Sequence, residues 1–131
     1  MRPNSGEWPA DLSAIASPPK ELHYTGDIAI LSRPCVAIVG SRQHTSYGAR
    51  VARELATALA SAGACIVSGM AFGIDTIAHR AALDADGLTA AVLGTGVDVV
   101  YPRGNRELYD EIAEHGLVVS EFKPGTGPFQ G

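Results

Sequence analysis

The sequence predicts a Rossmann-like α/β domain, in which helices on both faces cover a parallel sheet. Three observations favour this fold class. Apolar strands alternate with amphipathic helices, and the strands are apolar throughout, as strands buried on both faces are. Three strands also run directly into turns of small residues, within the segments 35–42, 65–75 and 90–96. Because the carboxyl ends of parallel strands meet at one edge of a sheet, we expect the functional site at that edge.

The domain division is predicted to be an N-terminal extended arm and lead-in at 1–34, followed by a core at 35–131. The arm is rich in Pro, Ser and Ala, and Trp8 is its expected apolar anchor. A short extended piece around Leu22 and Tyr24 follows it. After a turn at Gly26-Asp27, residues 28–31 are expected to form a helical turn.

The first helix of the core is predicted from its caps and its apolar spacing. It begins at Thr45 or Ser46, either of which can cap its N-terminus, and Gly63 is placed to end it. The expected apolar face of this helix consists of apolar positions at helical spacing, namely Val51, Leu55, Ala58, Leu59 and Ala62. Strand 64–68 follows the helix directly.

Two further helices complete the predicted pattern. The second helix stops near Gly87, and its expected inner side chains are Ile74, Ile77, Ala78, Ala81 and Ala82. The third helix runs over about 104–115, uses Leu108 and Ile112 as core contacts and ends at Gly116. The remaining strands are 89–93 and 117–120. The tail, 122–131, is rich in Pro and Gly, and four strands are few for this architecture, so we expect the chain to be the first part of a longer domain.

Composition places the chain among single globular domains. It has 131 residues, of which 46% are hydrophobic and 18% are charged. Cys35 and Cys65 form no C-x-x-C or metal-ligand pattern, so we expect both to be small buried hydrophobic residues in a reducing cytoplasm. No metal site and no cofactor are predicted. No apolar stretch approaches the ~20 residues that span a bilayer, and we expect a soluble cytoplasmic protein.

The net charge of −4 argues against a generally basic nucleic-acid binder, but the charge is unevenly distributed. Between residues 28 and 53 there is no acid, and four arginines bracket the first turn: Arg33, Arg42, Arg50 and Arg53. An anionic ligand at that turn is one interpretation. The other is a solvated helix face with an arginine at the strand edge.

Several enzyme classes lose support because their motifs are missing. There is no G-x-x-x-x-G-K-[ST], and segment 94–99 lacks the third glycine of G-x-G-x-x-G. Ser68 and Ser120 end strands outside any G-x-S-x-G. Asp75 and His79 share a helix face and could be a proton-transfer pair or metal ligands. The favoured interpretation is structural: Asp75 contacts the N–H groups at the start of its helix, and His79 packs beside it.

The order and spacing of the motifs match one known family. The motif segments are 36–42 with Thr45, Tyr47 and Gly48, then 67–75 with 78–79 and 81–83, then 92–96, Tyr101-Pro102, Asn105, Leu108 and 116–124. Upstream, residues 8–27 fit the approach to the first strand. Over about 8–129 the chain resembles the DNA-processing protein A family (DprA, also called Smf).

The resemblance implies an extended Rossmann domain that binds single-stranded DNA in DNA processing and helps to load the recombinase RecA during natural transformation. It implies no chemical step, so we expect no enzyme, and it implies a homodimer. Guanidinium groups and exposed backbone N–H groups suit a phosphate chain. The DNA-phosphate-binding residues that the resemblance implies are Gly40, Ser41, Arg42, Ser68, Gly69, Gly73 and Gly94.

The chain departs from the family pattern in two places. Phe72 stands where the family usually has arginine, which removes a positive charge and supplies either a surface for base stacking or a simple packing group. The chain also ends before the family's Phe-Pro-x-Arg-Asn-Arg segment, which carries basic residues and much of the dimer surface. We therefore expect the homodimer to be weakened.

Two alternatives remain open at this point. The first is a nucleotide-binding protein or a nucleotide phosphoribohydrolase of the related Rossmann group. Such hydrolases carry P-G-G-x-G-T-x-x-E, whereas the nearest segments here, 94–96 and 124–127, lack the paired glycines and the glutamate. The second alternative is an inactive fragment.

Overall fold

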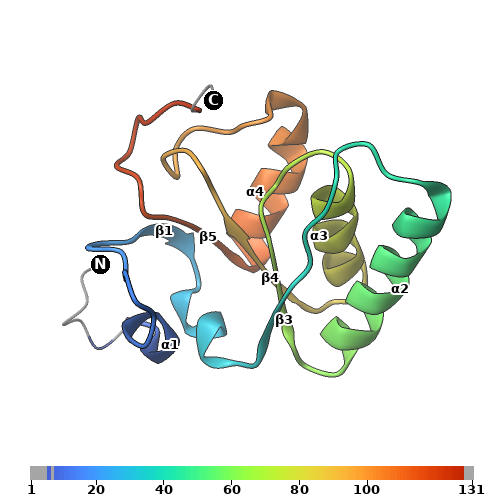
Figure 1. Ribbon diagram of the computed structural model, residues 1–131, viewed down its shortest axis with the longest axis horizontal. Helices are drawn as coiled ribbons and strands as arrows, with labels where there is room; N and C mark the ends of the chain where they lie inside the picture. Colours follow the sequence, from blue (N-terminus) through green and yellow to red (C-terminus); the bar gives the residue numbers. More distant parts are fainter. Residues whose placement is uncertain (1–5, 7, 129–131) are drawn as a thin grey trace.

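Five strands form one sheet in the computed structural model, which describes residues 6 and 8–128 (Figure 1). Their order across the sheet is β1-β5-β4-β3-β2. The strands β2, β3, β4 and β5 are parallel, and β1 is antiparallel to β5. The bounds are β1 (His23–Gly26), β2 (Cys35–Ala37), β3 (Cys65–Ser68), β4 (Leu88–Val92) and β5 (Leu117–Ser120). The predicted α/β fold class is confirmed.

The strand β1 comes from the segment that the sequence assigned to the lead-in. His23 lies opposite Ser120, and Gly26 lies opposite Leu117. Gly26 has a φ of 107°, and a Cβ at this position would meet the carbonyl of Gly116. The prediction of four strands was therefore one strand short, because four residues of alternating polarity do not reveal a partner strand more than ninety positions away.

Three helices cover one face of the sheet: α2 (Ser46–Ser61), α3 (Ile74–Asp84) and α4 (Arg106–His115). They lie side by side in Figure 1, with α3 in the middle. The predicted helix cap is confirmed, since Oγ1 of Thr45 accepts a hydrogen bond from the N–H of Gly48 at 2.9 Å. Gly63, with a φ of 97°, follows the end of α2 as predicted.

The buried face of α2 differs from the predicted one. Its buried residues are Ala52, Ala56 and Ala60, whereas Val51 and Leu55 are 40% and 48% exposed. Ala58 and Ala62 are also exposed, and Leu59 is partly buried. The reason is close packing: a Cβ on Gly87 would lie 2.6 Å from the Cβ of Ala60. Even a methyl group would not fit on Gly87 at that distance, so the chain passes close to α2 at Ala60. Ala56 and Ala60 also pack in one core cluster with Ala78, Ala81 and Ala82 of α3, and small side chains let these helices approach. The other predicted core contacts that are buried are Ala78, Ala81, Ala82, Leu108 and Ile112.

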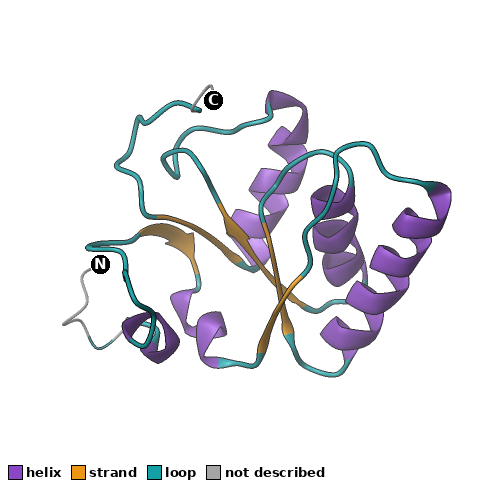
Figure 2. Ribbon diagram, in the orientation of Figure 1, coloured by secondary structure: helices purple, strands orange, loops and turns teal. Residues whose placement is uncertain are grey.

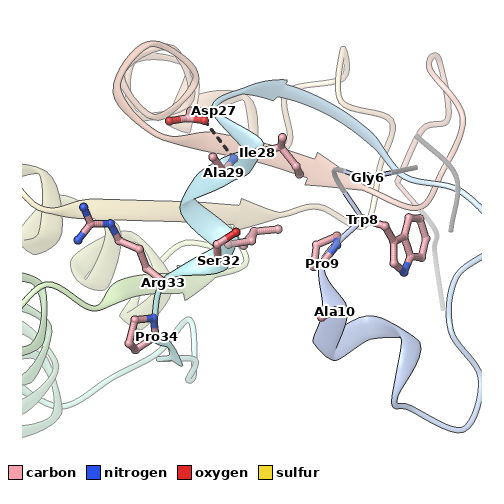
Figure 3. A pocket seen from close by; sticks show the side chains of 11 residues that line it. Gly6, Trp8, Pro9, Ala10, Asp27, Ile28, Ala29, Ser32, Arg33 and Pro34 are labelled. Carbon is pink, nitrogen blue, oxygen red and sulfur yellow. Dashed lines mark hydrogen bonds between the residues drawn. The ribbon is translucent and has the colours of Figure 1, made fainter. Parts of the chain in front are cut away.

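The opposite face of the sheet is covered by α1 (Ala10–Ser13) and the 3-10 helix η1 (Ile28–Ser32). Trp8 and Ile30 pack there against Cys65, Ala90, Leu117 and Val119. Trp8 is 8% exposed, which confirms it as the apolar anchor. The helical turn predicted at 28–31 is η1, and the carboxylate of Asp27 caps it by accepting a hydrogen bond from the N–H of Ala29 at 3.0 Å (Figure 3).

A hollow of about 790 Å³ lies between α1 and η1, and its lining includes Arg33 and Pro34. Figure 3 shows the side chains that line it. Pro34 immediately precedes β2, so this hollow lies at the amino end of that strand, away from the glycine turns. Arg33 therefore does not flank the first turn, and the predicted cluster of four arginines is wrong for this residue. The residues that line this hollow with Arg33 are not part of the first glycine turn.

The two cysteines lie in different environments. Cys65 is fully buried in the core, as predicted, whereas Cys35 is exposed. The prediction for Cys35 was wrong because β2 is the last strand of the sheet and has β3 as its partner on one side. No helix in the described part of the chain is long and apolar enough to cross a membrane.

Candidate functional site

The loops that follow β2, β3 and β4 leave the sheet on the same side (Figure 2). These loops contain the three glycine turns, so the predicted edge does bring them together. A hollow of about 260 Å³ lies among them. The residues that line it are Arg42, Gly69, Ala71, Leu93, Gly94, Thr95, Tyr101, Pro102 and Pro128.

Asp75 holds the first and second turns together. Its Oδ1 accepts a hydrogen bond from the N–H of Gly40 at 3.3 Å, and its Oδ2 accepts from Gly69 at 3.2 Å and Ala71 at 3.4 Å. The sequence predicted contact with N–H groups of its own helix, but these donors come from the preceding loops. Side chains in the first turn of a helix lean back toward its N-terminus, and here that direction leads into the loops. The N–H groups of Gly40 and Gly69 are therefore already engaged by a protein carboxylate.

Gly73 brings the two turns into direct contact. Its φ is 88°, and a Cβ there would meet the backbone of Ser41 and Arg42. The N–H of Ile74 also donates to the carbonyl of Ser41 at 3.3 Å. The side chain of Ser41 is used within its own turn, where Oγ accepts from the N–H of Gln43 at 3.0 Å. Ser41 and Gly73 thus shape the wall of the site, and Arg42 is the residue of the first turn that lines the hollow.

Ser68 is buried, whereas Gly94 is exposed. The Ser68 side chain is buried, and its hydroxyl donates to the carbonyl of Ile38 at 2.6 Å, so it ties β3 to the end of β2. At Gly94 an added Cβ would have nothing within 4 Å, so the backbone there faces open space. Of the predicted residues, Arg42, Gly69 and Gly94 line the hollow itself, and Ser68 lies beneath it.

Asn105 supports the second turn, a role that the sequence did not indicate. It is buried, and its Nδ2 donates to the carbonyl of Met70 at 2.8 Å and to Oγ1 of Thr76 at 3.0 Å. Met70 has a φ of 67°, so a non-glycine residue adopts a left-handed conformation in this turn. A buried amide that bonds the carbonyl of such a residue fixes the shape of the loop.

In the described loops after β3 and β4, two aromatic side chains are exposed. Tyr101, 44% exposed, lines the hollow, and Phe72, 45% exposed, lies in the second turn close to Gly104. Tyr101 was part of the recognised motif but not of the predicted site. The sequence did not show that the ring of Tyr101 is exposed. An exposed aromatic ring that lines the same hollow as an unpaired guanidinium offers a surface for a base beside a phosphate.

Arg42 contributes a positive charge to the hollow at this edge. This side chain is exposed and makes no ion pair with any residue in the ranges 6 and 8–128. By contrast, Arg80 pairs with Glu111 at 2.6 Å on the helical face. Arg50 lies over the ring of Tyr47, 5.7 Å from its centroid. The hollow can therefore bind an anion through the unpaired guanidinium of Arg42.

His79 does not take part in the site. Its Nδ1 lies 2.7 Å from Oγ1 of Thr89, and that hydroxyl donates to the carbonyl of Ile66 at 2.7 Å. The single hydroxyl proton is thus used, so Nδ1 of His79 is the donor. Burial lowers the pKa of His79 from 6.5 to about 4, which keeps the ring neutral. Asp75 and His79 thus both make structural contacts, although the contacts of Asp75 are with the preceding loops and not with its own helix. No group of three metal-ligating side chains occurs among the described residues.

A model of the DNA recombination-mediator protein A family matches residues 1–131. The DNA processing protein DprA of Streptococcus pneumoniae is 46% identical over 123 residues, which are 94% of this chain and 43% of that protein. The protein Smf of Synechocystis is 42% identical over 135 residues, covering 100% of this chain and 34% of that protein. The chain thus spans less than half the length of these curated relatives.

Two solved structures have the same fold. The X-ray structure of DprA from Streptococcus pneumoniae superimposes with a TM-score of 0.93 at 43% identity, covering 99% of this chain and 46% of that chain. DNA processing protein A from Helicobacter pylori superimposes with a TM-score of 0.86 at 37% identity, covering 94% and 56%. The Helicobacter pylori structure is described for its single-stranded DNA binding mode.

Proposed function

The chain belongs to the DNA recombination-mediator protein A family, and on that premise we propose that it binds single-stranded DNA at the glycine-turn edge of its sheet. The observation that carries the proposal is the hollow in which an unpaired Arg42 and an exposed Tyr101 lie beside the open backbone of Gly94. A guanidinium suits a phosphate, and an aromatic ring suits an unpaired base. The Helicobacter pylori relative, described as binding single-stranded DNA, supports this ligand.

The proposed site and the site predicted from the sequence differ in the groups that contact DNA. Because Asp75 already accepts from the N–H groups of Gly40 and Gly69, these glycines act by shaping the turns. Of the residues predicted from the sequence, Arg42 and the exposed backbone at Gly94 are left to contact DNA. The other predicted residues shape the turns and do not themselves contact DNA in this proposal; they are Gly40, Ser41, Ser68, Gly69 and Gly73.

The wider role follows from the family. We propose that the whole protein works in DNA processing and natural transformation in the cytoplasm, as a homodimer that loads the recombinase RecA. We propose binding without a chemical step, because Asp75, the buried carboxylate among the described residues of this edge, is occupied by three backbone N–H groups. Glu121, the other acid in a motif turn, lines other hollows than Arg42 does. This arrangement favours a binding role over the phosphoribohydrolase alternative.

Binding to single-stranded DNA is expected to be independent of sequence and to weaken steeply with salt. Each neutralised phosphate should contribute a slope of about −0.7 in a plot of log K against log salt concentration. The measurement is the fluorescence anisotropy of a labelled oligonucleotide over a salt series. The duplex of the same sequence is the control and should bind more weakly, because its bases are already stacked. Absence of binding at low ionic strength would contradict the proposal.

The Arg42→Ala variant is expected to bind single-stranded DNA about 10- to 100-fold more weakly, since a hydrogen bond to a charged group contributes ~1.5–3 kcal/mol. The matched control is Arg53→Ala, which removes the same charge from the exposed side of α2, in a different hollow. The salt slope should become shallower for Arg42→Ala alone. Equal losses in the two folded variants would remove Arg42 from the site.

A further inference from the structure

The two cysteines are neighbours across the β2–β3 pair. They are thirty positions apart in the sequence, but the parallel register places Cys35 directly opposite Cys65. Residues that pair in this way point to the same face of a sheet, and their strands lie about 4.8 Å apart. That spacing falls within the range of Cα separations, about 4.4–6.8 Å, that a disulfide can bridge.

Contacts on that face agree with the register. Cys65 packs in the core cluster with Trp8, and Val67 packs against the same cluster. Cys35 and Val67 both line a largely apolar groove of about 430 Å³ on this face. The two thiols therefore lie on one side of the sheet, and the groove leads from solvent to the outer one.

The two thiols differ in their access to solvent. Cys35 is exposed, and its Sγ–H donates to the carbonyl of Arg33 at 3.2 Å. Cys65 is fully buried. Burial, with the thiol of Cys35 beside it, raises the pKa of Cys65 from 9.0 to about 12. Because the thiolate is the nucleophile in disulfide exchange, Cys35 must react first and Cys65 second.

We propose that Cys35 and Cys65 form a reversible disulfide that cross-links β2 to β3, made by exchange with a low-molecular-weight disulfide such as oxidised glutathione. In the first step the Cys35 thiolate attacks one sulfur of that disulfide, whose S–S bond breaks. One small thiolate leaves and takes up the proton that Cys35 lost. Cys35 is then held in a mixed disulfide.

In the second step Cys65 gives up its proton and attacks the sulfur of Cys35. The mixed disulfide breaks, and the second small thiolate leaves with that proton. The two cysteines have together lost two electrons, and the small disulfide has been reduced to two thiols. The reverse exchange with a reduced small thiol reopens the bond, so the cross-link follows the redox poise of its surroundings.

The position of this cross-link gives it a structural effect. β2 has three residues and pairs with β3 on one side, and its carboxyl end leads into the turn that carries Arg42. A covalent bond between the strands would fix the start of this short edge strand. The inference rests on the strand register and does not depend on the proposed DNA binding.

The test is to equilibrate the native full chain with mixtures of oxidised and reduced glutathione and to measure its intact mass and free thiols. We expect both thiols to be lost together, with a mass change that corresponds to the loss of two hydrogens and no bound glutathione. Peptide mapping should then join the segments that contain Cys35 and Cys65. Reduced glutathione in excess should restore both thiols.

Two single variants separate the steps. Cys65→Ser should stop at the mixed disulfide, with one glutathione on Cys35, and Cys35→Ser should take up no glutathione while it is folded. Circular dichroism checks the fold of each variant. Wild-type protein that keeps glutathione on Cys35 beside a free Cys65 at equilibrium would overturn the proposal, as would rapid modification of Cys65 in folded Cys35→Ser.

Discussion

The Asp75→Asn variant is expected to lose about 3 kcal/mol of unfolding free energy, a large part of the stability of a domain this size. The two carboxylate oxygens of Asp75 accept from three backbone N–H groups of two different loops. An amide has one acceptor oxygen, so in either orientation its NH₂ group faces an N–H donor. The substitution also removes the charge that strengthens the remaining bonds.

The measurement is urea unfolding at neutral pH, followed by circular dichroism. The matched control is Asp84→Asn, which removes the same charge from the exposed last residue of α3. That variant should change the unfolding free energy little, because an acid at a helix C-terminus is mildly unfavourable. If Asp75→Asn were as stable as Asp84→Asn, Asp75 would not be what joins the two turns.

The second large effect concerns pH and the buried His79. The pKa of His79 in the folded protein is about 4, against 6.5 for the free side chain. Between these values the unfolded chain binds more protons than the folded one, so stability falls as the pH falls. The contribution of His79 is fully present above pH 6.5 and is lost as the pH falls through 4. The total loss from this residue is about 3 kcal/mol.

The pH dependence can be isolated by comparing unfolding free energies between pH 7 and pH 4 for wild type and His79→Asn. Asparagine offers a donor near the position of Nδ1, so the bond to Thr89 can be kept. The variant should show a flatter dependence over this range than wild type does. His44→Asn, which makes the same substitution at an exposed histidine, is the matched control. Parallel curves for wild type and His79→Asn would show that His79 is not the group that titrates.

The sequence determined most of the fold through local signals. Apolar strands, Thr45 as a helix cap and Gly63 as a helix end identified the elements, because caps and periodicity act over a few residues. They did not show which helix face packs inward. The alanine face of α2 is buried because α2 packs against the alanines of α3 and against Gly87, and these contacts exist only in the folded molecule.

The candidate site divides in the same way. The sequence located the three glycine turns and Arg42, because each is a contiguous motif that ends a strand. Only the tertiary structure decided how they are used. Asp75 reaches from α3 to N–H groups of two loops, Tyr101 lines the hollow beside Arg42, and Cys35 meets Cys65 across two strands. These relations join residues far apart in the sequence, and no local pattern records which of them the packing of the sheet brings together.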